Sequence, residues 1–368
     1  VLYLTATDQE TFDLRTGATL IAIALVAATI MTWGVDRPAQ VFPRSGRRLR
    51  IQAAMVVTSL VVGGLPLGVA GGAIAYQRQQ EISQQVQVGV DPDHPGALAL
   101  GKGQASEWTK PPVPGPLAVT AEWVSLSTTK CDEAVAARVE SENSSCRRLP
   151  SSSDDAVRAV VVGDSHAAQN AIPTLRLLHD TKDWDITAYL KGACSFGLPE
   201  YYKGSCRDRN SAVLEQMEDD PPDVVVLQTT ETSEDSSLEL LRPGIKRLVE
   251  RLTSEGITVV GFRDNPRSEE SLYECASTVG PETMVGGCVF PKEDVMAAED
   301  PAKFLEEIPL FHQIDASDML CPDDVCGTII GDVFVYMDDN HVSATYSRTM
   351  APELASRIEQ AMGIEEPE

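Results

Sequence analysis

The stretch Val160–His166, which reads Val-Val-Val-Gly-Asp-Ser-His, sets three β-branched residues directly before a Gly-Asp-Ser turn. Residues 167–172 read as the start of a helix, so a strand that ends abruptly presents Ser165 at a helix N-terminus, with Asp164 as the expected cap. This position lies at the carboxyl edge of a sheet, where clefts form in open α/β folds. Backbone N–H groups at the turn, that of Ser165 included, can face a developing oxyanion.

A second motif lies near the C-terminus, where Asp338 precedes His341 by three residues and directly follows the apolar run Val333–Val335 and Tyr336-Met337. A serine needs a base to become nucleophilic, and a carboxylate can orient the imidazole of that base. The two motifs together predict Ser165 as the nucleophile, His341 as the general base and acid, and Asp338 as the group that orients His341.

Apolar runs of strand length alternate with helical patterns in the second half of the chain. Strands are expected at 157–162, 186–189, 224–227, 257–262 and 333–336, and helices at 167–178, 211–217, 238–254 and 351–362. Alternation of helices with fully apolar strands indicates an α/β domain, in which a parallel sheet is covered by helices on both faces.

Two long apolar runs, Leu14–Trp33 and Ala53–Tyr76, lie near the start of the sequence. Each approaches the ~20 residues that cross a bilayer, so two transmembrane helices are expected; buried helices of a soluble core are the alternative. The arginine-rich segment 37–50 between them is expected on the cytoplasmic side by the positive-inside rule. Everything after the second run is then expected outside the membrane.

The eight cysteines all lie after residue 130, and none forms a C-x-x-C pair, so a zinc ribbon is not expected. The acidic runs lack the regular spacing of a calcium loop, so no metal site is predicted. Eight cysteines permit about a hundred pairings. Read in chain order they form four neighbouring pairs, Cys131/Cys146, Cys194/Cys206, Cys275/Cys288 and Cys321/Cys326. Such local pairs fit disulfides in an oxidising compartment, and reduced cytosolic thiols are the alternative.

The net charge of −25 argues against a nucleic-acid partner and against an anionic membrane surface. We interpret it as a solvated acidic surface that keeps an exported protein soluble.

These motifs resemble those of the SGNH, or GDSL-like, hydrolases. More narrowly, they resemble the extracytoplasmic SGNH domain that is fused to membrane acyltransferases of the acyltransferase 3 family. The form Val-Gly-Asp-Ser-His at 162–166, the run Lys191–Cys194 and the pattern Asp-x-x-His-Val-Ser at 338–343 are typical of that branch. The resemblance covers residues 120–362 and implies a three-layer SGNH-hydrolase (flavodoxin-like) fold. It also places an oxyanion donor at the backbone N–H of Gly192, in addition to that of Ser165; an ordinary turn is the alternative for Gly192.

The sequence departs from the wider family at one position of the predicted oxyanion hole. Glu231 stands where the family carries an asparagine that donates to the oxyanion, and a carboxylate there would repel negative charge. Either the hole has only two backbone donors, or a threonine hydroxyl beside Glu231 contributes. His166 either lies beside the site or serves a local carbonyl, and Phe262–Pro266 forms either a wall of the cleft or a structural turn.

The segment Trp33–Pro38 resembles the end of the last helix in the acyltransferase 3 membrane domain, with Asp36 in place of the usual glutamate. The predicted division of the chain is 1–50, the last helix and a cytoplasmic loop of such a domain; 51–76, a transmembrane helix; 77–117, a Pro-, Gly- and Gln-rich tether or wrapping linker; and 118–368, the SGNH domain. No cofactor is expected in this chain. Acyl-CoA would serve the rest of the membrane domain, which this sequence does not contain.

The expected activity is transfer of an acyl group, expected to be acetyl, to a hydroxyl of a cell-envelope or secreted glycan through an acyl-serine. The alternatives are a membrane-anchored carbohydrate O-acetyl esterase and a non-catalytic glycan-binding module. The expected partners are the glycan acceptor, the membrane and an acyl-donating membrane domain. The expected location is the cell membrane, with the C-terminal domain on the extracytoplasmic side.

Overall fold

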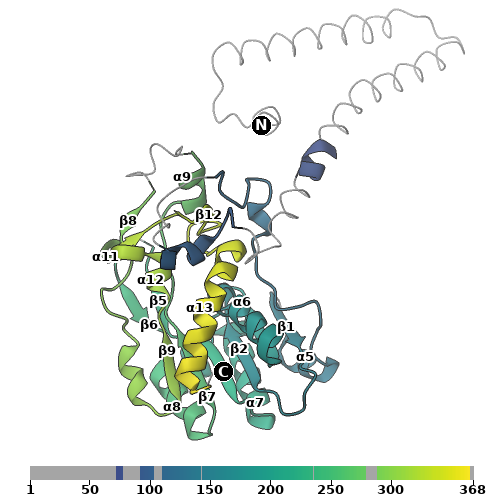
Figure 1. The fold of residues 1–368 in the computed structure, drawn as a ribbon. Helices are drawn as coiled ribbons and strands as arrows, with labels where there is room; N and C mark the ends of the chain where they lie inside the picture. Colours follow the sequence, from purple (N-terminus) through teal and green to yellow (C-terminus); the bar gives the residue numbers. More distant parts are fainter. Residues whose placement is uncertain are drawn as a thin grey trace, which may run out of the picture. The chain divides into compact units, whose positions relative to one another are not determined.

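The computed structural model in Figure 1 describes residues 72–77, 92–102, 110–141, 143–234, 236–278 and 288–364. The chain divides into two compact units, Val1–Ser83 and Gln84–Glu368. In the first unit the described residues are 72–77, which are helical. None of the helices in the described ranges is long and apolar enough to cross a bilayer. The two predicted spans, at 14–33 and 53–76, lie outside the described residues except for 72–76.

A six-stranded sheet forms the centre of the second unit, with the strand order β1-β3-β2-β4-β7-β9. The strands are β1 (Ser144–Leu149), β2 (Arg158–Gly163), β3 (Asp185–Lys191), β4 (Val224–Gln228), β7 (Thr258–Phe262) and β9 (Phe311–Ile314). All neighbours are parallel except the edge strand β1, which runs antiparallel to β3. The chain leaves β2 toward β3 and then returns to the other side of β2 with β4. This reversal creates a switch point next to the end of β2.

Helices cover both faces of this sheet, as the sequence predicted (Figure 1). The helices α6 (Ser165–Lys182) and α13 (Ala344–Met362) pack against each other over one face. The helices α5 (Glu133–Val139), α7 (Gly204–Asp219) and α8 (Ile245–Ser254) cover the other. Strand β2 is continuously apolar because both of its faces are buried. Val161 packs into the core under α6 and α13, and Val160 and Val162 pack into the core under α7 and α8.

Short elements connect these layers. The helices are α9 (Leu272–Thr278), α11 (Lys292–Val295) and α12 (Ser317–Leu320), with 3-10 turns η2 (Gly96–Lys102), η3 (Val119–Ala121), η4 (Pro199–Tyr201), η5 (Lys303–Glu307) and η6 (Pro322–Asp324). Three antiparallel ladders pair β5 (Thr230–Thr232) with β6 (Glu239–Leu241), β8 (Phe290–Pro291) with β10 (Val325–Cys326), and β11 (Ile329–Ile330) with β12 (Val333–Phe334).

Two predicted elements were wrong in detail. The strand expected at 333–336 is limited to β12, which pairs with β11 instead of the central sheet; the sheet ends with β9, which the sequence pattern did not predict. The helix expected at 238–254 begins only at Ile245, because Pro243 and Gly244 interrupt it and Gly244 takes a left-handed φ of 72°. Residues 239–241 form β6 instead.

The predicted disulfide pairing is confirmed. Bonds join Cys131–Cys146, Cys194–Cys206, Cys275–Cys288 and Cys321–Cys326. Each bond closes a short loop, and such bonds persist in oxidising, extracytoplasmic compartments.

Residues 92–102 and 110–117 of the expected linker belong to the second unit and pack within it. The amide of Gly96 donates to the carbonyl of Gly331 at 3.0 Å, and that of Val113 donates to the carbonyl of Asp332 at 3.1 Å. The side chains of Ala97 and Ala99 are buried. These contacts favour the wrapping form of the linker over a free tether.

Candidate active site

Three side chains that the sequence singled out form one hydrogen-bonded chain. The Oγ of Ser165 lies 2.8 Å from the Nε2 of His341, and the Nδ1 of His341 lies 2.8 Å from the Oδ2 of Asp338. Because a carboxylate accepts at Nδ1, that nitrogen carries the proton, and Nε2 is left to accept from the serine hydroxyl. The structure therefore brings residues 176 positions apart into the geometry of an activated serine.

A tight turn holds Asp338 in place. Its Oδ1 accepts from the backbone N–H of His341 at 2.7 Å and from that of Asn340 at 3.0 Å. Burial by itself raises the pKa of Asp338, but the hydrogen bonds from the His341 ring and from these two amides outweigh burial and lower the pKa. Asp338 is therefore ionised near neutral pH and can stabilise an imidazolium at His341.

The nucleophile is presented by the predicted strand-to-helix turn. Ser165 is the first residue of α6, and the Oδ1 of Asp164 caps that helix by accepting from the backbone N–H of His166 at 3.1 Å and of Ala167 at 3.3 Å. Gly163 has a φ of 149°, and a Cβ at this position would lie 2.5 Å from the Cβ of Ala167. The close approach of the strand end to the helix thus requires glycine.

The predicted oxyanion donors differ in their surroundings. The N–H of Ser165 lies in the first turn of α6, where helix geometry leaves amides without an intrahelical acceptor. The N–H of Gly192 instead donates to the carbonyl of Asn143 at 3.2 Å, where β1 meets β3. That bond engages the amide of Gly192, whose role as an oxyanion donor stays a prediction with the ordinary turn as its alternative.

Threonine hydroxyls beside Glu231 do not replace the missing asparagine. Thr229 donates its hydroxyl proton to the carbonyl of Phe262 at 3.0 Å, and Thr232 donates to that of Asn265 at 2.7 Å. The hydroxyl oxygen of Thr230 accepts from the amide of Asp264 at 2.9 Å. All three hydroxyls support the loop after β7.

A buried arginine neutralises the carboxylate at the unusual position. The side chain of Arg242 is 5% exposed, and its NH1 lies 2.8 Å from the Oε2 of Glu231. The same guanidinium reaches the Oδ2 of Asp164 at 3.4 Å and the Oγ of Ser195 at 3.2 Å. The negative charge of Glu231 is therefore paired beside the nucleophile turn. Sequence reasoning missed Arg242, because it lies eleven residues after Glu231 with no recognisable motif around it.

A second histidine–aspartate pair, His166 and Asp264, lies next to the pair of His341 and Asp338. His166 is 4% exposed, and its Nδ1 lies 2.8 Å from the Oδ1 of Asp264 while its Nε2 lies 3.0 Å from the Oδ1 of Asn340. The amide nitrogen of Asn340 donates to Asp339, which turns the amide oxygen toward His166. Both ring nitrogens of His166 thus face acceptors, and both carry protons in the imidazolium form.

The charge of this pair follows from its partners. Burial lowers the pKa of His166, but the Asp264 carboxylate outweighs burial and raises it. Burial likewise raises the pKa of Asp264, whereas His166 and the nearby Arg267 and Arg242 lower it. Both shifts, and the acceptors that face both ring nitrogens, favour the imidazolium–carboxylate form of this pair. The ring centroid of His166 lies 5.0 Å from that of His341.

The loop after β7 fixes the loop that carries Asp338 and His341. The Nδ2 of Asn265 donates to the carbonyl of Asn340 at 2.7 Å, and the amide of Ser268 donates to that of Asp339 at 2.9 Å. The amide of Leu272 donates to the carbonyl of Asp338 at 3.1 Å. The segment Phe262–Pro266 thus contributes directly to the site's support, through Asp264 and Asn265.

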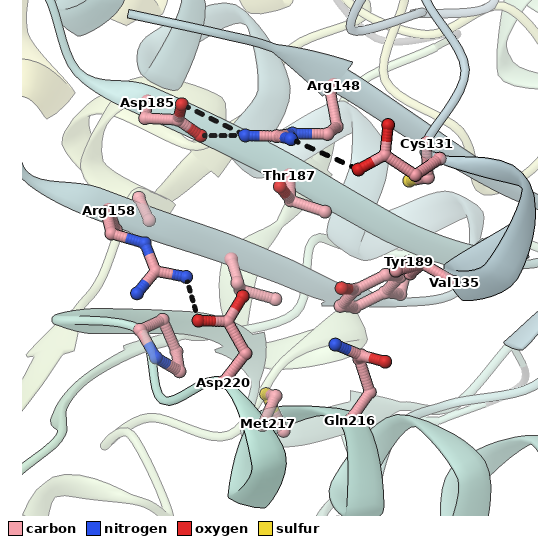
Figure 2. Close-up of a pocket in the computed structure, with 14 residues that line it drawn as sticks. Cys131, Val135, Arg148, Arg158, Asp185, Thr187, Tyr189, Gln216, Met217 and Asp220 are labelled. Carbon is pink, nitrogen blue, oxygen red and sulfur yellow. Dashed lines mark hydrogen bonds and ion pairs between the residues drawn. The ribbon is translucent and has the colours of Figure 1, made fainter. Parts of the chain in front are cut away.

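A small cavity lies at the end of the sheet where β2 and β3 begin (Figure 2). It has a volume of about 90 Å³ and is bordered by the first residues of β2 and β3, Arg158 and Asp185. Its charges are paired with one another: Arg148 with Asp185 at 3.2 Å, and Arg158 with Asp220 at 2.7 Å. Ligand pockets typically measure roughly 300–1,000 Å³, so this cavity does not compete with the Ser165 site. Within the described ranges no group of His, Cys, Asp or Glu side chains is arranged to hold a metal ion.

Comparison with known proteins places the chain in a family. Residues 130–356 match the model of the SGNH domain (fused to AT3 domains), and the chain therefore belongs to this family. Among solved structures, the periplasmic domain of a lipopolysaccharide acetyltransferase from Salmonella ser. Paratyphi A is similar at 16% identity. The match covers 56% of this chain and 85% of that domain, with a TM-score of 0.41. A search of curated proteins found no match.

Proposed function

We propose that the Ser165 site transfers an acyl group, an acetyl group in the simplest case, from an extracytoplasmic donor to a hydroxyl of a cell-envelope or secreted glycan. The observation that carries the proposal is the chain Ser165–His341–Asp338, with two contacts of 2.8 Å. Membership in a family of SGNH domains fused to AT3 domains supports transfer, because such domains occur together with a membrane acyltransferase.

In the first half of the proposed reaction, Ser165 Oγ attacks the acyl carbonyl of the donor while its proton moves to His341 Nε2. The backbone N–H of Ser165 supports the developing oxyanion, and Arg242 pairs with the carboxylate of Glu231 at 2.8 Å. His341 then returns the proton to the leaving group as the donor's acyl bond breaks. The product is an acyl ester on Ser165.

In the second half, a glycan hydroxyl gives its proton to His341 Nε2 and attacks the acyl-serine. The bond from the acyl carbon to Ser165 Oγ breaks, and His341 reprotonates the serine. Asp338 remains ionised throughout and stabilises the imidazolium twice. Water can attack the acyl-serine in the same way. Ester hydrolysis at this site would therefore differ from transfer only in the acceptor.

The test is product analysis with the full chain, an activated acetyl ester and a glycan. We expect acetylated sugar as a product. We expect Ser165→Ala to lower its formation at least ~10³-fold, because His341 and Asp338 have no nucleophile to activate without Ser165. The exposed Ser254→Ala, at the end of α8, is the matched control. Acetate as the sole product would assign the site to an esterase, and an unchanged rate in Ser165→Ala would exclude the proposed mechanism.

A further inference from the structure

An exposed tryptophan borders the proton acceptor of the site. The side chain of Trp123 is 51% exposed, and its ring packs edge-on against the ring of His341 with centroids 4.8 Å apart and an interplanar angle of 64°. An acceptor hydroxyl must approach His341 closely to lose its proton. A molecule that delivers this hydroxyl therefore comes within reach of Trp123.

Buried contacts hold Trp123 in that position. The preceding residue, Glu122, is 1% exposed, and its carboxylate accepts from the backbone N–H of Thr345 at 2.7 Å and from its hydroxyl at 3.1 Å. Its carbonyl accepts from the amide of Ala344 at 3.1 Å. Thr345 lies in the first turn of α13, four residues after His341. The same helix start therefore holds the segment of Trp123 and follows the loop of His341.

Trp123 also lines a groove between α6 and α13. Its volume is about 600 Å³, within the range of sites that hold small molecules. We call it the α6–α13 groove. It is lined by Leu98, Trp123, Val124, Ser125, Ile172, Pro173, Arg176, Leu177, Asp180, Arg348, Ala351 and Pro352.

The lining combines apolar surface with a few charged groups. Ile172, Leu177 and Ala351 supply apolar walls. Burial lowers the pKa of Arg348, the carboxylate of Glu122 raises it, and the nearby Arg176 lowers it further. The NH1 of Arg176 donates to the carbonyl of Ser125 at 3.2 Å, which holds that guanidinium at the groove. Arg176 thus offers a fixed guanidinium to a ligand in the groove, and Asp180 offers a carboxylate.

A sugar ring matches this lining. One face of a pyranose presents C–H groups that pack on an indole ring, and its rim presents hydroxyls that accept from guanidinium groups and donate to a carboxylate such as Asp180. Apolar chains lack the hydroxyls that would use the arginines. Polypeptides lack a repeated flat C–H face for Trp123.

We propose that Trp123 and the α6–α13 groove form the acceptor subsite, which holds a saccharide chain with one pyranose ring on Trp123 and a hydroxyl of that ring directed to His341. The proposal rests on the proposed function, because it names the acceptor site of the same reaction. It also predicts a binding property that is measurable without any turnover.

Binding is measured first, on the full chain carrying Ser165→Ala so that no turnover occurs. The probes are a neutral glucan hexasaccharide and a hexasaccharide that contains uronic acids, in a calorimetric titration. We expect at least one probe to bind. Trp123→Ala and Arg176→Ala should each weaken that binding about tenfold or more, and Trp123→Phe should retain most of it. Phe304→Ala, an exposed aromatic in η5 on the other side of the sheet, is the control.

Kinetics on the chain with Ser165 intact separate acceptor binding from support of His341. We expect Arg176→Ala, which is remote from the base, to raise the half-saturating saccharide concentration about tenfold while release of p-nitrophenol from p-nitrophenyl acetate changes far less. Equal losses in both measurements for Trp123→Ala and Arg176→Ala would overturn the subsite, as would absence of binding by both probes. If saccharide binds through Trp123 but only acetate is produced, the subsite stands and the proposed transfer fails.

Discussion

At the residue scale, the centre of the site contains two histidine–carboxylate pairs with different tasks. His341 is partly open and contacts the nucleophile, whereas His166 is buried and contacts the loop that carries His341. The buried His166 ring holds that loop through the hydrogen bond between its Nε2 and the Oδ1 of Asn340. We therefore regard His166 as a positioning residue, whose titration affects folding of the site.

The pH dependence of stability follows from the direction of the shift. The pKa of His166 is raised in the folded chain, so its contribution to stability is fully present below the ordinary value of 6.5 and is lost as pH rises through the folded pKa. The charged groups facing it are Asp264, Arg267 and Asp164, and the His341 ring lies beside it. His166→Gln should lower the free energy of unfolding by about 1.5–3 kcal/mol, because the buried Asp264 loses a charged hydrogen-bond donor. Arg267 still lies 3.2 Å from the Oδ2 of Asp264, so that carboxylate keeps one charged partner.

Denaturant unfolding of the full chain, measured from below pH 6.5 to well above it, checks this expectation. The unmodified chain should lose stability across that interval, and His166→Gln should lose less. His179→Gln, at a half-buried histidine of α6 that bonds to the carbonyl of Trp184, is the control. Parallel pH curves for the unmodified chain and His166→Gln would contradict the assignment of an imidazolium.

Motifs revealed some of these residues and not others. Ser165, Asp338 and His341 each stand in a short pattern next to an apolar run, and these patterns singled them out. Sheet topology accounts for Ser165 at the end of β2, but Asp338 and His341 follow β12, which lies outside the central sheet. Trp123 and Arg242 stand in no pattern. Their positions depend on contacts with segments far along the chain, which residue order alone does not encode.

At the element scale, the turn between β2 and α6 determines where the nucleophile lies. Replacement of Gly163 by alanine would bring a Cβ to 2.5 Å from the Cβ of Ala167, at a φ that alanine rarely adopts. We expect Gly163→Ala to displace the start of α6, with a loss of about 1–3 kcal/mol in stability and a larger fractional loss of acyl transfer. Thermal unfolding and product analysis measure the two effects.

Gly327→Ala is the matched control, because a Cβ there meets its nearest neighbour at 3.6 Å, an ordinary contact. If Gly163→Ala retained both stability and full activity, the strand-to-helix turn would not have the rigid role assigned to it.

Elements were predictable where they are buried on both faces. Strands β2, β4 and β7 are continuous apolar runs and were found. Edge strands were not: β1 reads Ser-Ser-Cys-Arg-Arg-Leu with one fully buried residue, and β9 reads Phe-His-Gln-Ile with its two central residues half-buried. An edge strand needs no continuous apolar run, so its sequence resembles a loop.

At the scale of the whole molecule, disulfides reinforce the outer parts of the domain. The bond Cys131–Cys146 joins the segment before α5 to the antiparallel edge strand β1, across a separation of 15 residues. Closure of such a loop contributes about 3 kcal/mol in the chain-entropy model. The double variant Cys131→Ala/Cys146→Ala should lose stability of this order, measured by denaturant unfolding under oxidising conditions.

Addition of a reductant supplies the comparison for that variant. The unmodified chain should lose stability when reduced, and the double variant should lose less, because one of its bonds is already absent. A double variant as stable as the unmodified chain would show that β1 is held by its ladder with β3 alone.

The central claim is that Ser165 carries the acyl group between donor and acceptor. Brief incubation of the full chain with p-nitrophenyl acetate, an acid quench and mass spectrometry of its peptides test it directly. We predict one acetyl group on the peptide that contains Ser165, absent in His341→Ala and discharged when a saccharide acceptor is added before the quench. Turnover of the ester by the unmodified chain without any acetyl group on Ser165 at any time of quenching, and with Ser165→Ala equally active, would contradict the account.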